Sequence, residues 1–136
     1  MQSTINPYIN LKGNAREAVE FYKDVFGASV DMNTFEEFNM AQNPEDAEKI
    51  MHAQLEVDGK IILMVSDVPE SMPHNPGGTV TISLSGDNEE EIRSYWEKLS
   101  DGALTTMPLD KAPWGDTFGM VTDKFGINWM VNINAK

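Results

Sequence analysis

The stretch YINLKGNAREAVEFYKDVFG, residues 8–27, decides the fold. Residues 8–11 form a short apolar run that predicts a β-strand, and this strand ends at Gly13-Asn14. Apolar side chains then recur at helical spacing, which predicts an amphipathic helix that is capped by Asn14 and ended by Gly27. The apolar positions of this helix are Ala15, Ala18, Val19, Tyr22, Val25 and Phe26. A strand that leads through a glycine turn into a helix is therefore the first part of the fold.

The same order returns in TVTISLSGDNEEEIRSYWEKLS, residues 79–100. Apolar and hydroxyl side chains alternate along its first part, which predicts a strand. The core-facing residues of this strand are predicted to be Val80, Ile82 and Leu84. Gly86 then opens a helix with an acidic first turn, and a tyrosine follows the glycine at the same spacing in both halves, as Tyr22 and Tyr95. The chain thus contains an internal repeat, which constrains a fold more than any single motif does.

Three strands are predicted after each helix. In the first half, MHAQLEV at 51–57 alternates apolar with polar residues, as a strand with one buried face does. Asp58-Gly59 predicts a hairpin turn that leads into KIILMVS at 60–66, a more fully buried strand. The other predicted strands are 29–38, 103–109, 117–122 and 128–133. The sequence therefore predicts an α+β fold of two tandem βαβββ modules with mixed sheets.

Polar segments separate these elements. NPEDAEKI at 43–50 predicts a helical turn within a loop. The stretch DVPESMPHNPGG at 67–78 carries three prolines and two glycines, which predicts a linker and not a helix or strand. We therefore expect a single domain over 136 residues, with one module at 1–66, the linker at 67–78 and a second module at 79–136.

Charge and composition exclude several classes of function. The chain has 10 Lys and Arg against 22 Asp and Glu, and so acidic a surface repels nucleic-acid phosphates and favours solubility. It has no cysteine, which excludes disulfides and thiol catalysis and fits a cytoplasmic location. No apolar run approaches the ~20 residues of a membrane span, and the N-terminus lacks a signal-peptide pattern. We expect neither nucleic acid nor membrane as a partner.

Three segments carry a resemblance to a known family: PYINLKGNAREAVEFYKDVFGASV (7–30), HAQLEVDGKIILMVSD (52–67) and DKFGINWMVNI (123–133). With its duplicated βαβββ unit, the chain resembles the vicinal oxygen chelate superfamily, which includes glyoxalase I, extradiol dioxygenases and bleomycin-resistance proteins. Within that superfamily it resembles the PhnB-like branch. The resemblance implies the glyoxalase/bleomycin-resistance fold, in which curled sheets form a cavity, and a homodimer that exchanges or pairs modules.

Metal enzymes of this superfamily take ligands, typically His, Gln or Glu, from four strand positions, two in each module. The corresponding positions here are Asn6 or Pro7, the segment 61–65, Thr81 and Met130. None of them supplies an imidazole or a carboxylate, and a thioether and a hydroxyl do not suit iron, nickel or zinc. The sequence therefore predicts the scaffold without its metal site, and no cofactor. Trp129, which alternates with Met130, is expected to pack in the core on the helix side.

His52 is the candidate catalytic residue. It shares one face of the strand 51–57 with Gln54 and Glu56, and a histidine with a carboxylate on its face can transfer protons near neutral pH. Residues four apart on a strand are separated by about 13 Å, so His52 and Glu56 cannot touch directly. We expect His52 to line the cavity near Tyr8. The alternative is a polar face that is solvated or buried in a dimer interface. The second histidine, His74, lies in the linker.

A ligand cavity is expected to have mostly apolar walls with a few polar groups. The segment APWGDTFG at 112–119 combines Gly, Pro and aromatic residues, which suits a mobile loop over a cavity mouth. In antibiotic-binding relatives a tryptophan of this region stacks on the ligand, which implies the same role for Trp114. The predicted ligand-binding residues are Tyr8, Asn10, Gln54, Glu56, Met64, Thr81, Trp114, Phe118 and Met130. Ordinary core packing is the alternative for each apolar one among them.

Three functions remain open at this point. The first is a metal-free homodimer that binds a small, partly apolar molecule in the inter-sheet cavity. The second is a lyase or oxidoreductase of the superfamily that uses His52 as an acid–base or a metal at a displaced site. The third is a structural or regulatory protein with a vestigial cavity. PhnB-like proteins often carry a methyltransferase label, but the doubly wound sheet and glycine-rich turn of common methyltransferases are missing here.

Overall fold

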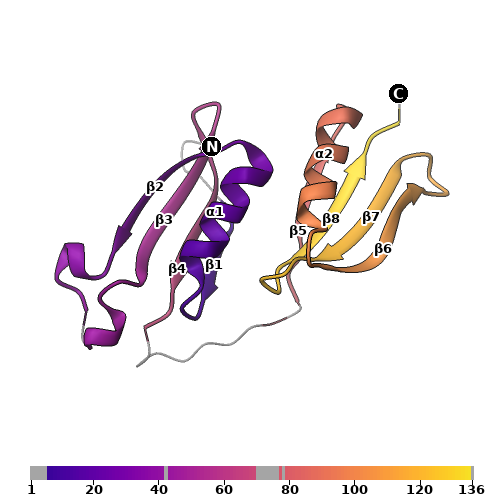
Figure 1. Cartoon of the computed structure of the whole chain (residues 1–136). Helices are drawn as coiled ribbons and strands as arrows, with labels where there is room; N and C mark the ends of the chain where they lie inside the picture. The colour runs from indigo at the N-terminus through magenta and orange to yellow at the C-terminus, as the bar shows by residue number, and fades with distance from the viewer. Residues whose placement is uncertain (1–5, 42, 70–76, 78, 136) are drawn as a thin grey trace. The chain divides into compact units, whose positions relative to one another are not determined.

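The structure is a computed structural model that describes residues 6–41, 43–69, 77 and 79–135, and it divides into two compact units, 1–76 and 77–136 (Figure 1). The linker residue His74 and most of the predicted linker lie outside the described residues. The first unit contains β1 (Tyr8–Leu11), α1 (Ala15–Phe26), β2 (Ser29–Thr34), the 3-10 turns η1 (Glu36–Phe38) and η2 (Pro44–Asp46), β3 (Ile50–Val57) and β4 (Lys60–Asp67). The second unit contains β5 (Ile82–Gly86), α2 (Glu89–Leu99), β6 (Leu104–Lys111), β7 (Thr117–Thr122) and β8 (Asn128–Ile133).

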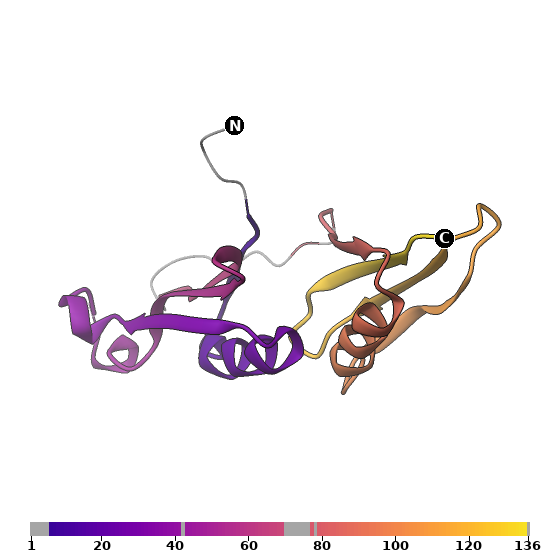
Figure 2. The ribbon, with the colours of Figure 1, turned by 90° about the horizontal axis from the view of Figure 1, so that it is seen from above.

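Both units have the same sheet topology. The strand order is β1-β4-β3-β2 in the first sheet and β5-β8-β7-β6 in the second. The first strand of each unit pairs in parallel with the last, and all other pairs are antiparallel. Figure 2 shows α1 against one face of the first sheet and α2 against one face of the second. The predicted α+β fold of two βαβββ modules is thus confirmed.

Two predicted strands are shorter than expected. The strand predicted for 79–85 begins only at Ile82. The prediction that Val80 is a core residue is wrong, because its side chain is 78% exposed. The reason is the length of the partner strand: pairing with β8 begins at Ile82 and Trp129, so the residues before Ile82 have no ladder to join. The strand predicted for 29–38 ends at Thr34, after which the chain turns through η1.

The first module is held together by the carboxylate of Asp67, at the end of β4. Its Oδ1 accepts the backbone N–H groups of Gly13 and Ala15, at 2.8 and 3.0 Å, and its Oδ2 accepts that of Ile50 at 3.0 Å. The prediction that Asn14 caps α1 is wrong, because its side chain makes no capping bond and Asp67 meets the free N–H groups instead. Gly27 ends the helix, as predicted, and it adopts the left-handed conformation. One buried carboxylate therefore fixes the β1–α1 turn and the start of β3.

In the second module, Gly119 allows α2 to lie close to its sheet. A Cβ at Gly119 would come within 2.9 Å of both the Trp96 ring and the Leu109 backbone, so only glycine fits here. Ile92, Val131 and Ile133 form the core beside this contact. Trp129 is buried on the helix side, as predicted, and its indole N–H donates to Asp123 at 2.9 Å. Among the described residues, no helix is long and apolar enough to span a membrane.

We predict that Asp67→Asn lowers the free energy of unfolding by about 2–4 kcal/mol, because the amide N–H₂ replaces one of the two carboxylate oxygens and must face at least one backbone N–H that loses its acceptor. Urea denaturation of the variant measures this loss. Asp31→Asn, an exposed carboxylate of β2, is the matched control and should change stability by no more than about 0.5 kcal/mol. Equal effects of the two substitutions would contradict the role given to Asp67.

Candidate functional site: the uncovered faces of the two sheets

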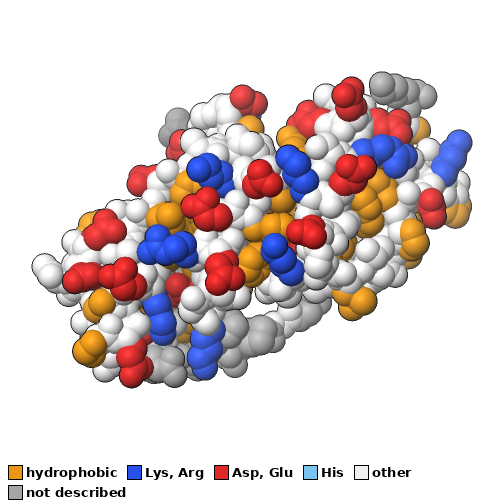
Figure 3. All heavy atoms as spheres, viewed as in Figure 1, with side chains coloured by type: hydrophobic (Ala, Val, Ile, Leu, Met, Phe, Trp, Pro, Cys, Tyr) orange, Lys and Arg blue, Asp and Glu red, His pale blue; other side chains and the backbone are white. Residues whose placement is uncertain are grey.

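Each sheet has one face that its own helix covers and one that it leaves uncovered, and strand alternation assigns side chains to them. On β1, Ile9 and Leu11 are each 5% exposed on the α1 side, which places Tyr8 and Asn10 on the uncovered face. On β3, Ala53 and Leu55 are fully buried, whereas His52, Gln54 and Glu56, on the other face, are half-buried. The side of the first unit on which α1 lies shows acidic and basic side chains beside one another and no visible histidine (Figure 3).

The uncovered face of the first sheet brings together the polar residues that the sequence predicted. Met64 of β4 pairs with Tyr8 of β1 on one side and with Gln54 of β3 on the other. We call this set the His52 face, defined by Tyr8, Asn10, His52, Gln54, Glu56 and Met64. The prediction that His52 lies near Tyr8 is confirmed: the Tyr8 hydroxyl is 3.3 Å from His52 Nδ1, and the ring centroids are 5.8 Å apart. Their participation in ligand binding stays a prediction.

A chain of hydrogen bonds continues from this pair along β3. His52 Nε2 is 3.5 Å from Gln54 Oε1, and Gln54 Nε2 donates to Glu56 Oε1 at 3.4 Å. His52 and Glu56 do not touch, as the strand geometry predicted, but Gln54 bridges them. The sequence excluded the direct contact and did not reveal the bridge. All three distances lie at the long end for hydrogen bonds, as is common for catalytic or binding groups without a ligand.

The uncovered face of the second sheet is more apolar. Met120 of β7 stands opposite Met130 of β8, while Phe118 occupies the same face of β7. The Phe118 ring meets the exposed Trp114 ring edge to face, with centroids 5.5 Å apart. We call this set the Met130 face, defined by Trp114, Phe118, Met120 and Met130. The sequence analysis missed Met120, although the alternation from Phe118 could have revealed it.

Two further predictions, Thr81 and the segment 112–119, lie at the edge of the Met130 face or outside its strands. Thr81 is half-buried and lies directly before β5, so it belongs to no strand. Continued strand alternation would place its side chain on the Met130 face. The segment predicted as a mobile loop is shorter than expected, because Phe118 and Gly119 belong to β7. A tight turn remains between β6 and β7, in which Ala112 N–H donates to the Asp116 carbonyl at 2.7 Å.

Asp116 joins this turn to the end of the chain. Its carboxylate accepts the backbone N–H of Ala135 at 2.8 Å and the side-chain amide of Asn132 at 3.1 Å. These bonds, first that from Ala135 and then that from Asn132, lower the pKa of Asp116 below its ordinary value of 3.8. Phe118 stands opposite Asn132 in the β7–β8 ladder, so Asp116 steadies the edge of the Met130 face.

A lowered pKa in the folded state means that the ionised carboxylate favours folding. This contribution is complete above the unfolded value of 3.8 and is lost as the pH falls through the lower folded pKa. We predict that Asp116→Ala is less stable than the wild type at pH 7 and that the two converge as the pH falls below 3.8. Thermal unfolding at several pH values measures this. A difference that persists at about pH 2.5 would show that the carboxylate charge is not its source.

The positions that correspond to the superfamily's metal ligands do not fit a divalent metal. Thr81 and Met130 offer a hydroxyl and a thioether, and the Asn6 amide donates to its neighbour's carbonyl oxygen at 3.4 Å. Within residues 6–41, 43–69, 77 and 79–135, no three side chains of His, Asp or Glu are grouped closely enough to hold a metal ion. We derive no chemistry through a metal for this chain.

We predict that the purified protein contains no stoichiometric zinc, nickel, iron or manganese, because the three donors named above do not suit these ions. Elemental analysis by mass spectrometry measures the content directly. A result of about one metal ion per chain, lost together with ligand binding on chelation, would refute this prediction and favour a displaced site.

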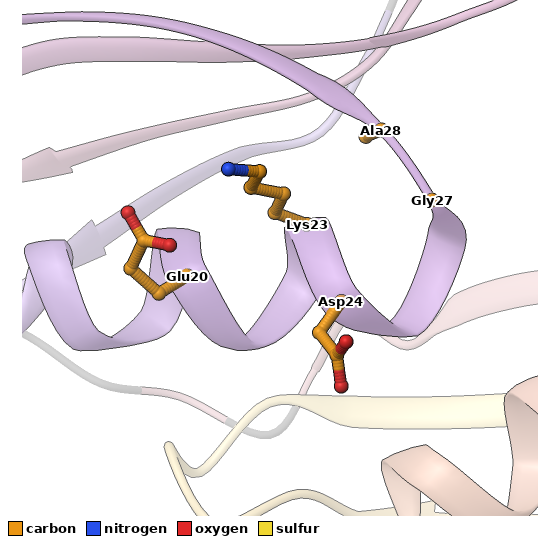
Figure 4. A pocket seen from close by; sticks show the side chains of 5 residues that line it. All are labelled: Glu20, Lys23, Asp24, Gly27 and Ala28. Atoms are coloured by element: carbon orange, nitrogen blue, oxygen red, sulfur yellow. The ribbon is translucent and has the colours of Figure 1, made fainter.

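A hollow of about 440 Å³ lies beside the C-terminal end of α1, and its lining includes no residue of the His52 face (Figure 4). Its lining consists of Glu20, Lys23, Asp24, Gly27 and Ala28. Glu20 and Lys23 project from one side of the helix and Asp24 from the other. A lining without any aromatic or large aliphatic side chain offers little to a partly apolar molecule, so we do not regard this hollow as the ligand site.

Comparison with known proteins places the chain among relatives over nearly its whole length. The family described as 3-demethylubiquinone-9 3-methyltransferase matches residues 3–132. Protein YjdN of Escherichia coli (strain K12) is 26% identical over 141 residues, which cover 95% of this chain and 94% of YjdN.

Solved structures agree with the fold. Protein PA1353 from Pseudomonas aeruginosa is 35% identical, with a TM-score of 0.84 over 99% of this chain and 100% of that chain. The PhnB protein from Bacillus cereus is 24% identical, with a TM-score of 0.75 over 97% of this chain and 100% of that chain. A glyoxalase/bleomycin resistance protein/dioxygenase family enzyme from Burkholderia phytofirmans is 11% identical, with a TM-score of 0.63 over 94% and 95%. The last two likenesses show the fold alone, and they confirm the fold predicted from the sequence.

Proposed function

The chain belongs to the 3-demethylubiquinone-9 3-methyltransferase (PhnB-like) family, and from this premise we propose that it binds a small, partly apolar molecule through side chains of its uncovered sheet faces. The observation that carries the proposal is the Tyr8–His52 pair, hydrogen-bonded on a sheet face that α1 leaves uncovered. An imidazole held by a hydroxyl and an amide is a polar anchor of the kind that fixes a ligand's orientation in an otherwise apolar pocket.

The Met130 face supports the apolar half of this proposal. Two methionines and an aromatic pair provide flexible and polarisable surface, which adapts to ring systems and alkyl groups. Of these residues, Trp114 is 63% exposed, so a ligand can reach it. The chain offers one polar and one apolar surface, which is the reason for proposing a ligand that is only partly apolar.

Methyl transfer is not part of the proposal. Each sheet has four strands of mixed direction and one helix on one face, whereas common methyltransferases build their cofactor site on a doubly wound sheet with a glycine-rich turn. The family's description concerns an activity, and the fold alone does not transfer it to this chain.

A second candidate function is acid–base catalysis by His52. The observation that favours it is the separation of 3.3 Å between the Tyr8 hydroxyl and His52 Nδ1, which permits proton transfer between the two groups. In this case the bound molecule would be a substrate with an acidic or basic centre beside Tyr8. The homodimer implied by the resemblance stays a prediction in either case.

We predict that His52→Ala weakens binding of a hit from a thermal-shift ligand screen roughly tenfold, because the Tyr8 hydroxyl loses the imidazole that orients it for the ligand. The fold should change little in stability, since His52 is half-buried at the uncovered face. Isothermal titration measures the affinity, and unfolding without ligand measures the stability. Arg16→Ala, on the exposed side of α1, is the control and should retain wild-type affinity. If His52→Ala unfolds the protein and the folded fraction binds normally, His52 is structural and the proposal fails.

A further inference from the structure

We infer that the hydrogen-bond chain on the His52 face leaves the Tyr8 hydroxyl as an acceptor, so that the site selects ligands that donate a hydrogen bond, such as phenols, amines and N–H heterocycles, over ligands that only accept one. This inference rests on the proposed function, because it names the chemical class of the ligand at the same site. It depends on the direction of three hydrogen bonds, each of which restricts the next.

The first restriction comes from Glu56. An ionised carboxylate can only accept hydrogen bonds, so Gln54 must present its N–H₂ group to Glu56 Oε1 across the 3.4 Å contact. The Gln54 amide is thereby fixed in one of its two orientations. Its carbonyl oxygen, Oε1, is the atom that faces the histidine.

The second restriction passes through His52. The Gln54 carbonyl oxygen can only accept, so His52 Nε2 must carry the proton at the 3.5 Å contact. In the neutral imidazole the other nitrogen, Nδ1, then has a free lone pair. The Tyr8 hydroxyl therefore donates its proton to Nδ1 across 3.3 Å.

The third restriction concerns the ligand. A tyrosine hydroxyl has one proton, and here that proton is already directed to His52. Only the oxygen lone pairs of Tyr8 are left for another partner, and the 47% exposure of this residue makes them accessible. A carbonyl or ether placed beside this oxygen would bring two acceptors together without a shared proton, which leaves the ligand's acceptor without a partner. Asp31, which stands opposite Gln54 in the β2–β3 ladder, adds a second acceptor to the face.

The chain of directions can be measured without any ligand. The protein has two histidines, so His74→Gln leaves His52 as the single imidazole for nitrogen-15 NMR. At about pH 8.5, where an ordinary imidazole is neutral, we expect the tautomer with the proton on Nε2. In Glu56→Gln, the new side-chain amide at position 56 can donate to the Gln54 carbonyl. The Gln54 amide can then turn its N–H₂ towards His52 Nε2, so the variant should show an increased share of the tautomer with the proton on Nδ1. A wild-type spectrum with the proton on Nδ1 would overturn the inference.

Ligand selection is tested with phenol and anisole, which differ in the O–H that phenol can donate. Chemical-shift titration of the wild type should show phenol binding about threefold to tenfold more tightly than anisole, as expected for one hydrogen bond. Tyr8→Phe should remove this preference, whereas Tyr95→Phe, which alters a hydroxyl bonded to Glu91 on α2, should keep it. Equal affinities in the wild type, or a preference that survives in Tyr8→Phe, would overturn the inference alone. Binding of neither probe would overturn it together with the proposed function.

Discussion

The buried Asp67 carboxylate is the interaction on which the first module depends. It accepts backbone N–H groups from the turn before α1 and from the first residue of β3, so it ties both neighbours of β4 to that strand. β1 and β3 each pair with β4, and these pairings define which side chains face away from α1. A slip of one residue would turn Tyr8 and His52 towards the helix. The position of the candidate site therefore follows from the register that Asp67 holds.

The second module repeats the topology with different contacts. Asn88 caps α2 with its own side chain, which accepts from Glu91 N–H at 3.1 Å, and β8 is followed by a backbone bond from Asn134 to Gly86. Its uncovered face has methionines and aromatic rings where the first module has a histidine and its polar partners. The duplication has thus produced one polar and one apolar surface on the same scaffold, and this difference is the basis for the proposed partly apolar ligand.

Much of the fold could be predicted because its signals are local and periodic. The helix positions around Tyr22 and the alternation around His52 follow from spacing along the chain alone. The Asp67 contacts could not be predicted in this way, because the partners of the carboxylate, Gly13, Ala15 and Ile50, are separated from it by 54, 52 and 17 positions in the sequence. Val80 was misplaced because alternation does not show where a partner strand begins. The bridge through Gln54 was missed because side-chain direction, and not strand spacing, decides whether one residue can join two others.

The most direct test of this account is a crystal structure with the tightest ligand found in a thermal-shift screen. The account predicts that the polar group of the ligand lies within hydrogen-bond distance of the Tyr8 hydroxyl, beside His52. A ligand bound in the hollow beside the end of α1, with both uncovered faces free of it, would contradict the account.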